Sequence, residues 1–217
     1  MKHITNTLQS GNYSTSLNMF VYDEVPENSA CLDVGCWNGN LGAKLIRDKN
    51  CIVDGVDVNT EMLKQAQKKG YHTTYVINLN SENVNFLDIK QKYDVIMFAD
   101  VLEHLINPEL VLKLAQQKLK KGGKIIISLP NVAFLLNRIQ LLLGKWEYRD
   151  FGTLDKTHLK FYTVDSGQKM VESAGMRVRK IVPYNQFGML PKIELIKNVF
   201  PRLLSYQFLI VCENSEE

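Results

Sequence analysis

One stretch near the N-terminus constrains the fold more than any other. Residues 30–34 form an apolar run, which leads into a loop with Gly35 and Gly39 and then into a helical pattern over 41–48. A strand, a glycine loop and a helix in this order hold backbone N–H groups at a helix N-terminus, which suits a small anionic or polar ligand group. A second apolar run over 52–56 leads to Asp57. An acid about 20 residues beyond such a loop is placed to bind a ribose hydroxyl, so the stretch predicts half of a nucleoside-cofactor site.

The alternation of strands and helices continues beyond this unit. Further strands are expected at 72–77, 93–98, 124–129, 176–182 and 207–213, and further helices at 17–25, 60–69, 108–119 and 163–174. A short helical turn is expected at 86–90 and a plain turn at 120–123. Strands this apolar, alternating with helices, indicate a mostly parallel sheet that is covered on both faces.

Two segments interrupt this pattern. The chain has 217 residues, which predicts a single domain over 1–217. A strongly apolar segment at 132–143 and the aromatic loop after it predict a helical lid insertion at about 132–160, and a second inserted helix is expected at about 191–204. The apolar segment has three open interpretations: a lid over a lipid-like or aromatic acceptor, a membrane-surface contact, and a helix packed on the core or on a twin subunit.

Composition excludes several classes of protein. Apolar residues make up 45% of the chain and charged residues 23%, which is ordinary for a soluble globular protein, and a net charge of +3 is too small to indicate nucleic-acid binding. The four cysteines form no CxxC pair, so we expect buried free thiols in a reducing compartment and no metal site. We find no signal-peptide pattern and no apolar run near the ~20 residues of a membrane helix, and we expect a cytoplasmic protein.

The glycine loop does not match the common nucleotide signatures. Trp37 and Asn40 interrupt the dinucleotide pattern GxGxxG, so an NAD-dependent oxidoreductase is disfavoured. The sequence contains no GxxxxGK[ST] phosphate loop, and the loop itself carries no Lys or Arg. Neither a dinucleotide nor a nucleoside triphosphate is therefore the favoured ligand.

Four motifs in register resemble those of class I S-adenosylmethionine (SAM) dependent methyltransferases. They are 32–39 (LDVGCWNG), the acid Asp57, 98–105 (FADVLEHL) and 121–131 (KGGKIIISLPN). Segment 150–162 (DFGTLDKTHLKFY) resembles the small-molecule branch, which includes ubiquinone-biosynthesis and surface-polysaccharide methyltransferases. The resemblance implies a Rossmann-like seven-stranded α/β sheet, mostly parallel with an antiparallel C-terminal strand, and SAM as the cofactor.

The resemblance also implies a role for each residue at these motif positions. The methionine part of SAM should be lined by Asp33, Gly35, Cys36 and Gly39. Asp57 should bind the ribose hydroxyls, Val58 should lie against the adenine, and Asn78 should accept from the adenine amino group. The residues expected beside the sulfonium are Ala99, Asp100 and Val101. A carboxylate that accepts two hydrogen bonds suits a vicinal diol.

Trp37 departs from the family pattern, because a glycine usually occupies this position. A tryptophan needs a negative φ and room for its ring, whereas glycine lets the backbone approach a ligand closely. This departure motivates an alternative function, in which the chain is a methyltransferase-fold binding or partner module with weak or no catalysis.

Methyl transfer to a hydroxyl needs a group that removes the proton, and histidine is the usual one. His3 is terminal and His72 begins a strand, so neither is favoured. His158, in the loop expected to cover the substrate, is the first candidate base, and His104, which follows the fourth strand, is the second. The competing interpretations are that His104 caps a helix and that His158 braces its loop through Asp155 or backbone.

The sequence therefore predicts a SAM-dependent methyltransferase that acts on a small-molecule acceptor, at a hydroxyl oxygen of a sugar or of an aromatic or polyprenyl metabolite. The segment after the fourth strand lacks the Asn/Asp-Pro-Pro-aromatic element of many amino-group and nucleic-acid methyltransferases, so nucleic acid is not expected as a partner. No integral membrane segment is expected, and a homodimer is left open.

Overall fold

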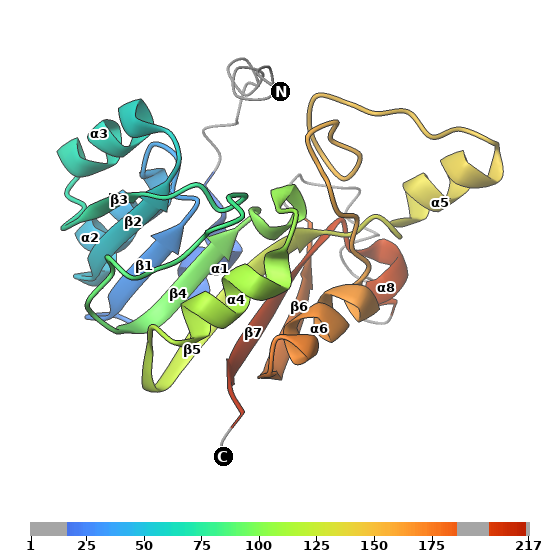
Figure 1. The fold of residues 1–217 in the computed structure, drawn as a ribbon. Coiled ribbons are helices and arrows are strands. Elements are labelled where there is room, and N and C mark those ends of the chain that lie inside the picture. The colour runs from blue at the N-terminus through green and yellow to red at the C-terminus, as the bar shows by residue number, and fades with distance from the viewer. Residues whose placement is uncertain (1–16, 186–199, 216–217) are drawn as a thin grey trace.

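The computed structural model describes residues 17–185 and 200–215 and contains one seven-stranded sheet (Figure 1). Its strand order is β3-β2-β1-β4-β5-β7-β6. The strands are β1 (Ala30–Val34), β2 (Ile52–Asp57), β3 (Thr74–Val76), β4 (Tyr93–Ala99), β5 (Leu119–Pro130), β6 (Met176–Tyr184) and β7 (Gln207–Asn214). Strands β1 to β5 pair in parallel, and β7 is antiparallel to both of its neighbours, β5 and β6. The predicted fold class is confirmed.

Helices cover both faces of the sheet. They are α1 (Met19–Glu24), α2 (Asn40–Lys49), α3 (Thr60–Lys68), η1 (Leu102–His104), α4 (Pro108–Gln116), α5 (Leu135–Leu142), α6 (Val164–Ser173) and α8 (Pro201–Leu204). The buried side chains of α1, α2 and α3 belong to one hydrophobic cluster, and those of η1, α4 and α6 belong to another. The sheet between them is apolar on both faces: Ile125, Ile126 and Ile127 of β5 are all fully buried. This is the burial pattern that parallel strands require.

One local prediction is wrong. Residues 120–123 are part of β5 and not a turn, because β5 begins at Leu119 and pairs with β4 through an irregularity: Tyr93 lies opposite Leu119, and Val95 lies opposite Lys124. The turn expected at 86–90 is present, since the Ile89 N–H donates to the Phe86 carbonyl at 3.1 Å. The pair Gly122 and Gly123 is typical of a turn, but the shift of register between β4 and β5 accommodates both glycines within the strand.

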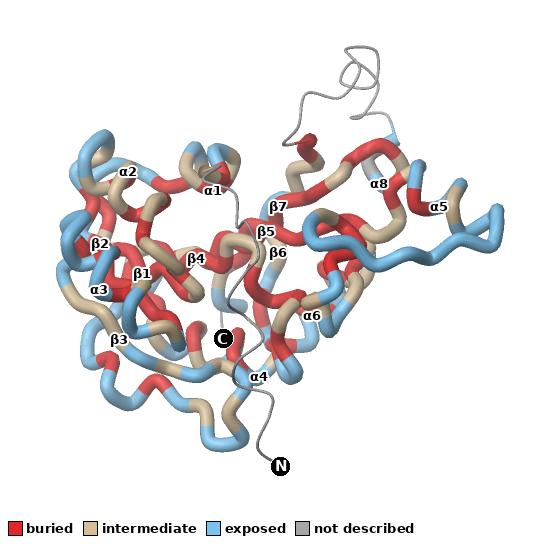
Figure 2. The backbone as a smooth tube through the Cα atoms, turned by 90° about the horizontal axis from the view of Figure 1, so that it is seen from above, coloured by how far each residue is buried: buried red, intermediate tan, exposed pale blue. Residues whose placement is uncertain are grey.

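The insertion after β5 projects from the body of the protein (Figure 1). Helix α5 buries Asn137 alone, and most of its apolar side chains are exposed, with Leu136 at 53% and Leu142 at 86%. Among residues 17–185 and 200–215, the apolar face of α5 therefore does not pack on the core. The loop that follows α5 is mostly exposed as well (Figure 2). Most of the second predicted insertion, 191–204, lies outside the described residues, and its last part is α8.

Candidate active site

The glycine loop between β1 and α2 has the shape that its glycines predict. Gly35 has a φ of +75°, and a Cβ added there would lie 2.6 Å from the Val101 side chain. Gly39 has a φ of +77° and is the N-cap residue of α2. Positive φ at both positions favours glycine, and the close contact with Val101 excludes any larger residue at position 35.

The backbone N–H groups of this loop are largely used within the protein. Those of Gly35 and Cys36 both donate to the Val56 carbonyl, at 2.7 and 3.0 Å, and that of Gly39 donates to the Cys36 carbonyl at 2.9 Å. These three groups are therefore not the ligand donors that the loop pattern alone suggests. The first two hold the loop against the end of β2, and the third closes a turn within the loop.

Asp57, at the end of β2, is held from two sides. Its Oδ2 accepts from the Trp37 N–H at 2.9 Å, and its Oδ1 accepts from the Asn59 N–H at 2.8 Å. An ionised carboxylate has about four acceptor sites, so two remain for a diol. The residue is 9% exposed. Asp57 therefore fits the ribose role, with its orientation set by the backbone.

Trp37 corrects one prediction. Its φ is +49° and not negative, so the residue adopts the left-handed conformation that the usual glycine would adopt. The hydrogen bond from its N–H to Asp57 supports this conformation. The main reason for a partner-module function is correspondingly weaker, because the tryptophan keeps the shape of the loop.

The remaining predicted cofactor residues lie along the same edge of the sheet. Asp33 is buried and accepts from the Tyr71 hydroxyl at 2.6 Å, and burial raises its pKa to about 6. Burial also raises the pKa of the Cys36 thiol, so this sulfur remains protonated. Val58 is 52% exposed, as an apolar wall for a ring would be before the ring binds. The side-chain oxygen of Asn78 accepts from the Asn80 N–H at 3.0 Å.

The end of β4 is a strained and polar corner. Asp100, between Ala99 and Val101, has a φ of +56°, which is uncommon for a residue other than glycine. Its carboxylate accepts from Asn18 Nδ2 at 3.2 Å and from Gln207 Nε2 at 2.9 Å. Burial raises the pKa of Asp100. Backbone strain of this kind clusters at functional sites, which favours the predicted place beside the reacting group.

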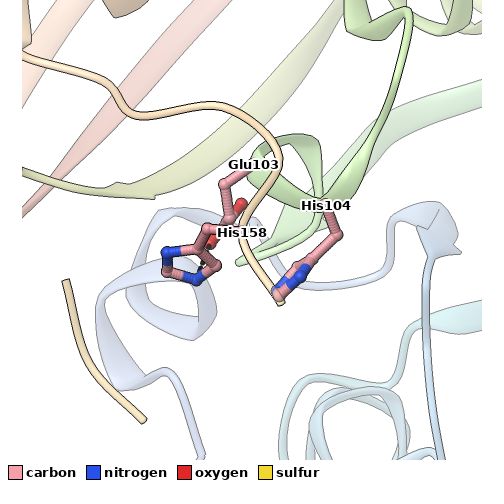
Figure 3. Close-up of side chains that lie close together, drawn as sticks. All are labelled: Glu103, His104 and His158. Atoms are coloured by element: carbon pink, nitrogen blue, oxygen red, sulfur yellow. Dashed lines mark ion pairs between the residues drawn. The ribbon is translucent and has the colours of Figure 1, made fainter. Parts of the chain in front are cut away.

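The segment after β4 and the long loop bring two predicted histidines together. Glu103 and His104 belong to η1, and His158 reaches them from the loop (Figure 3). The rings of His104 and His158 are 4.8 Å apart, and His158 Nε2 lies 4.0 Å from Glu103 Oε1. The loop is fixed there because the N–H groups of Leu159 and Lys160 donate to the Glu103 carbonyl at 2.8 and 3.0 Å.

Burial governs the charges of this cluster. The Glu103 side chain is 1% exposed, and burial raises its pKa well above the usual range. Burial lowers the pKa of His158 to about 4, and His104 nearby adds to the effect. Burial lowers the pKa of His104 as well. At neutral pH both rings are therefore uncharged.

The structure separates the competing interpretations of the histidines. The Asp155 carboxylate accepts from the Thr157 N–H at 2.8 Å and from the Thr157 hydroxyl at 2.7 Å, so it braces Thr157. The His158 ring has the Thr153 backbone as a hydrogen-bond partner, which supports the backbone form of the loop-bracing interpretation. His104 Nδ1 lies 3.2 Å from the Thr157 carbonyl, which links η1 to the loop. His72 is exposed and lies 3.1 Å from Asp54, away from this cluster.

Sequence reasoning missed Glu103. The residue stands within the quoted motif at 98–105, next to His104, but an acid in a short segment after a strand is usually exposed. Its burial depends on the loop that returns 50 residues later. A carboxylate adjacent to a candidate histidine was the available signal.

Aromatic side chains lie next to the cluster. Phe161 makes edge contacts with Trp146 at 5.6 Å and with His158 at 6.2 Å between ring centroids, and Tyr148 lies 6.3 Å from Phe161. The loop thus places an aromatic group next to His158. No helix of the described residues is long and apolar enough to cross a membrane.

Comparisons with known proteins agree with this geometry. The model of a family described as "Methyltransferase domain" matches residues 13–181. The ubiquinone biosynthesis O-methyltransferase of Coxiella burnetii is 24% identical, over 77% of this chain and 72% of its own length. The enzyme of the same name from Aeromonas salmonicida is 29% identical, over 77% and 71%.

Solved structures show the same fold at lower identity. A SAM-dependent methyltransferase from Clostridium acetobutylicum has a TM-score of 0.58 at 16% identity, covering 90% of this chain and 87% of its own. Magnesium protoporphyrin IX methyltransferase from Synechocystis, with bound S-adenosylhomocysteine, has a TM-score of 0.58 at 15% identity, covering 91% and 78%. The chain therefore belongs to the methyltransferase-domain family and has the fold of the SAM-dependent enzymes, which confirms the predicted family, fold class and cofactor.

Proposed function

We propose that this methyltransferase transfers the methyl group of SAM to a hydroxyl oxygen of a small molecule. The observation that carries the proposal is the cluster of Glu103, His104 and His158 at the carboxyl end of β4. It lies three residues beyond Asp100, which is expected beside the sulfonium. A group that handles a proton next to the reacting centre is what a hydroxyl acceptor requires.

SAM supplies an electrophilic methyl carbon: the acceptor O–H loses its proton, an O–C bond forms, and the C–S bond breaks with its electron pair left on sulfur. The chain's own residues position the reactants. We assign the ribose to Asp57, the adenine to Val58 and Asn78, the methionine part to Asp33, Gly35, Cys36 and Gly39, and the reacting end to Ala99, Asp100 and Val101.

Two observations favour an aromatic acceptor. Aromatic rings gather in the loop, where Trp146 and Tyr148 contact Phe161, which in turn contacts His158. The two curated relatives named above are O-methyltransferases of ubiquinone biosynthesis. A phenolic hydroxyl is therefore the first substrate class to test, and a sugar hydroxyl is the second.

In this proposal His158 and His104 face the acceptor hydroxyl, which is supported by their rings lying 4.8 Å apart next to Glu103. As the predicted bases, they are neutral at pH 7 and so free to accept a proton. A ring with a pKa of about 4 is nevertheless a weak base for a phenol, whose usual pKa is about 10. Basicity alone therefore does not explain how the cluster would assist the loss of the proton from the acceptor hydroxyl.

The test has two stages. Calorimetric titration with SAM comes first, and the absence of both heat and a thermal shift up to millimolar SAM would overturn the proposal and favour the partner-module alternative. Radiolabelled SAM is then offered with phenolic, sugar and amine acceptors. Label in an alkali-stable ether of a phenol or sugar supports the proposal, whereas label only in amines contradicts it.

A further inference from the structure

We propose that Glu103, His104 and His158 bind a divalent transition-metal ion. Each residue offers one ligand atom, and the three atoms lie within 4.8 Å of one another. Figure 3 shows Glu103 pointing from η1 toward the ring of His158, with His104 beside them. Two imidazoles and one carboxylate are a donor set of catalytic zinc sites and of non-haem iron sites.

One buried oxygen of the cluster lacks a partner among the described residues. Glu103 Oε2 is buried without a hydrogen bond, whereas the His158 ring has the Thr153 backbone as a hydrogen-bond partner. The Glu103 side chain is 1% exposed and that of His158 is 6% exposed, and the 4.0 Å between their nearest atoms is too long for a hydrogen bond. Buried polar groups are nearly always satisfied, so a carboxylate oxygen in this position indicates a partner that is not part of the chain.

The contacts around the cluster prepare His104 as a ligand. Its Nδ1 lies 3.2 Å from the Thr157 carbonyl, which only accepts, so Nδ1 carries the proton and Nε2 keeps its lone pair. Metal-binding histidines usually donate their second N–H in this way. The Thr157 hydroxyl in turn donates to Asp155 at 2.7 Å. The tautomer and the orientation of the ring are thus set before an ion binds.

The required movement is small. Ligand atoms around a tetrahedral ion stand about 3.4 Å apart when each is about 2.1 Å from the metal. The widest separation in the cluster therefore has to shrink by about 1.4 Å, which side-chain rotation of Glu103 and His158 can supply. The backbones need not move, because the Leu159 and Lys160 N–H groups already tie the loop to the Glu103 carbonyl.

The charges nearby favour a cation, since Asp100 and Asp155 add negative potential at Glu103. Three protein ligands leave an open position, where an acceptor oxygen can bind. A coordinated hydroxyl loses its proton more readily, and the proton then leaves to solvent. This role rests on the proposed function and makes His158 and His104 ligands instead of bases.

The test uses the full chain, stripped with a chelator and titrated with Co²⁺, followed by competition with Zn²⁺. We expect one Co²⁺ per chain, a visible d–d absorption of low-symmetry coordination, and displacement by Zn²⁺. Paramagnetically shifted NMR signals of two imidazole N–H protons should appear in the wild-type protein. The absence of these signals, or of saturable Co²⁺ binding, overturns the inference without any variant.

Variants locate the site. Glu103→Gln and His158→Gln should each lower Co²⁺ affinity more than about 100-fold, beyond the upper bound for losing only an outer-shell partner. His72→Gln is the matched control, because it removes the other histidine–carboxylate pair, with Nδ1 3.1 Å from Asp54. An equal loss in His72→Gln, or none in the cluster variants, contradicts the assignment.

SAM titration of the same metal-free samples separates the two proposals. SAM binding without Co²⁺ binding overturns the metal site and leaves the proposed function standing. Co²⁺ binding without SAM binding supports the metal site and overturns the proposed function. Retained SAM binding also shows that a variant is folded.

Discussion

The two halves of the site differ in where their polar groups find partners. In the cofactor half, the N–H groups of Gly35, Cys36 and Trp37 all donate to atoms of β2, so the loop is complete without a ligand. In the acceptor half, Glu103 Oε2 is buried without a hydrogen bond among the described residues. The first half is organised by its own backbone, whereas the second depends on something that is not part of the chain.

This difference predicts separable effects. Changes in the acceptor half should reduce turnover and leave cofactor affinity intact, because no described hydrogen bond joins the histidine cluster to the glycine loop. Changes in the cofactor half should reduce SAM affinity.

The largest expected effect is on turnover. Glu103→Gln and His158→Gln should each lower kcat by about 10²–10⁴-fold, the contribution of a group that manages a proton in the transition state. SAM affinity, measured by calorimetry, should stay within about twofold because the altered atoms are on the acceptor side.

The control for this prediction is His72→Gln, whose ring is exposed and distant from the cluster, and which should keep wild-type turnover. Wild-type kcat in both cluster variants would leave these side chains with a structural role only. A parallel loss of SAM affinity would show that the two halves are not separable.

The second prediction concerns pH. Asp33 is buried and its pKa is raised to about 6, from about 3.8. Between these values the folded protein binds more protons than the unfolded chain, so stability falls as pH rises through this window, and the loss is complete above pH 6. Asp33→Asn removes the charge and keeps an acceptor for Tyr71. Relative to wild type, it should gain up to about 3 kcal/mol between pH 4 and pH 7.

Urea unfolding at pH 4, 5, 6 and 7 measures this gain. Asp48→Asn is the control, because Arg47 holds the pKa of that exposed carboxyl at about 2 and it does not titrate in the window. A difference in the free energy of unfolding between Asp33→Asn and wild type that does not change with pH would contradict the raised pKa of Asp33.

The sequence predicted the shape of the glycine loop and the place of Asp57 at the end of β2, and the physical reason is that these contacts are local. The strand, loop and helix around Gly35 and Gly39 are contiguous, and Asp57 follows within the next strand. The prediction failed at the φ of Trp37, since no sequence pattern shows that the Asp57 carboxylate supports a left-handed tryptophan.

The acceptor half was predicted less completely. The two histidines were found, but the burial of Glu103 depends on a loop 50 residues away, which tertiary packing alone determines. The sequence left the exposure of α5 open between a lid, a membrane-surface contact and a packed helix, because an apolar run of this length is equally typical of a buried helix.

The third prediction addresses the ribose. Asp57→Ala should weaken SAM binding by about 1.5–3 kcal/mol, the scale of a hydrogen bond to a charged group. The same change removes the acceptor of the Trp37 and Asn59 N–H groups, so the free energy of unfolding should fall as well. Calorimetry and thermal unfolding measure the two effects. Unchanged SAM affinity would remove the ribose assignment, whatever the change in stability.

The smallest expected effect is on the free energy of unfolding when α5 is changed. This experiment also tests whether the acceptor half is complete within one chain. Leu142 is 86% exposed, so Leu142→Ser should change the free energy of unfolding by less than about 0.5 kcal/mol. Leu45→Ala in α2 is the contrast, because that side chain is fully buried and its truncation should cost about 2–5 kcal/mol. Urea unfolding at two protein concentrations measures both. A loss in Leu142→Ser that grows with protein concentration would place the apolar face of α5 against a second copy of the chain. The acceptor half would then be completed by another subunit and not by its ligand alone.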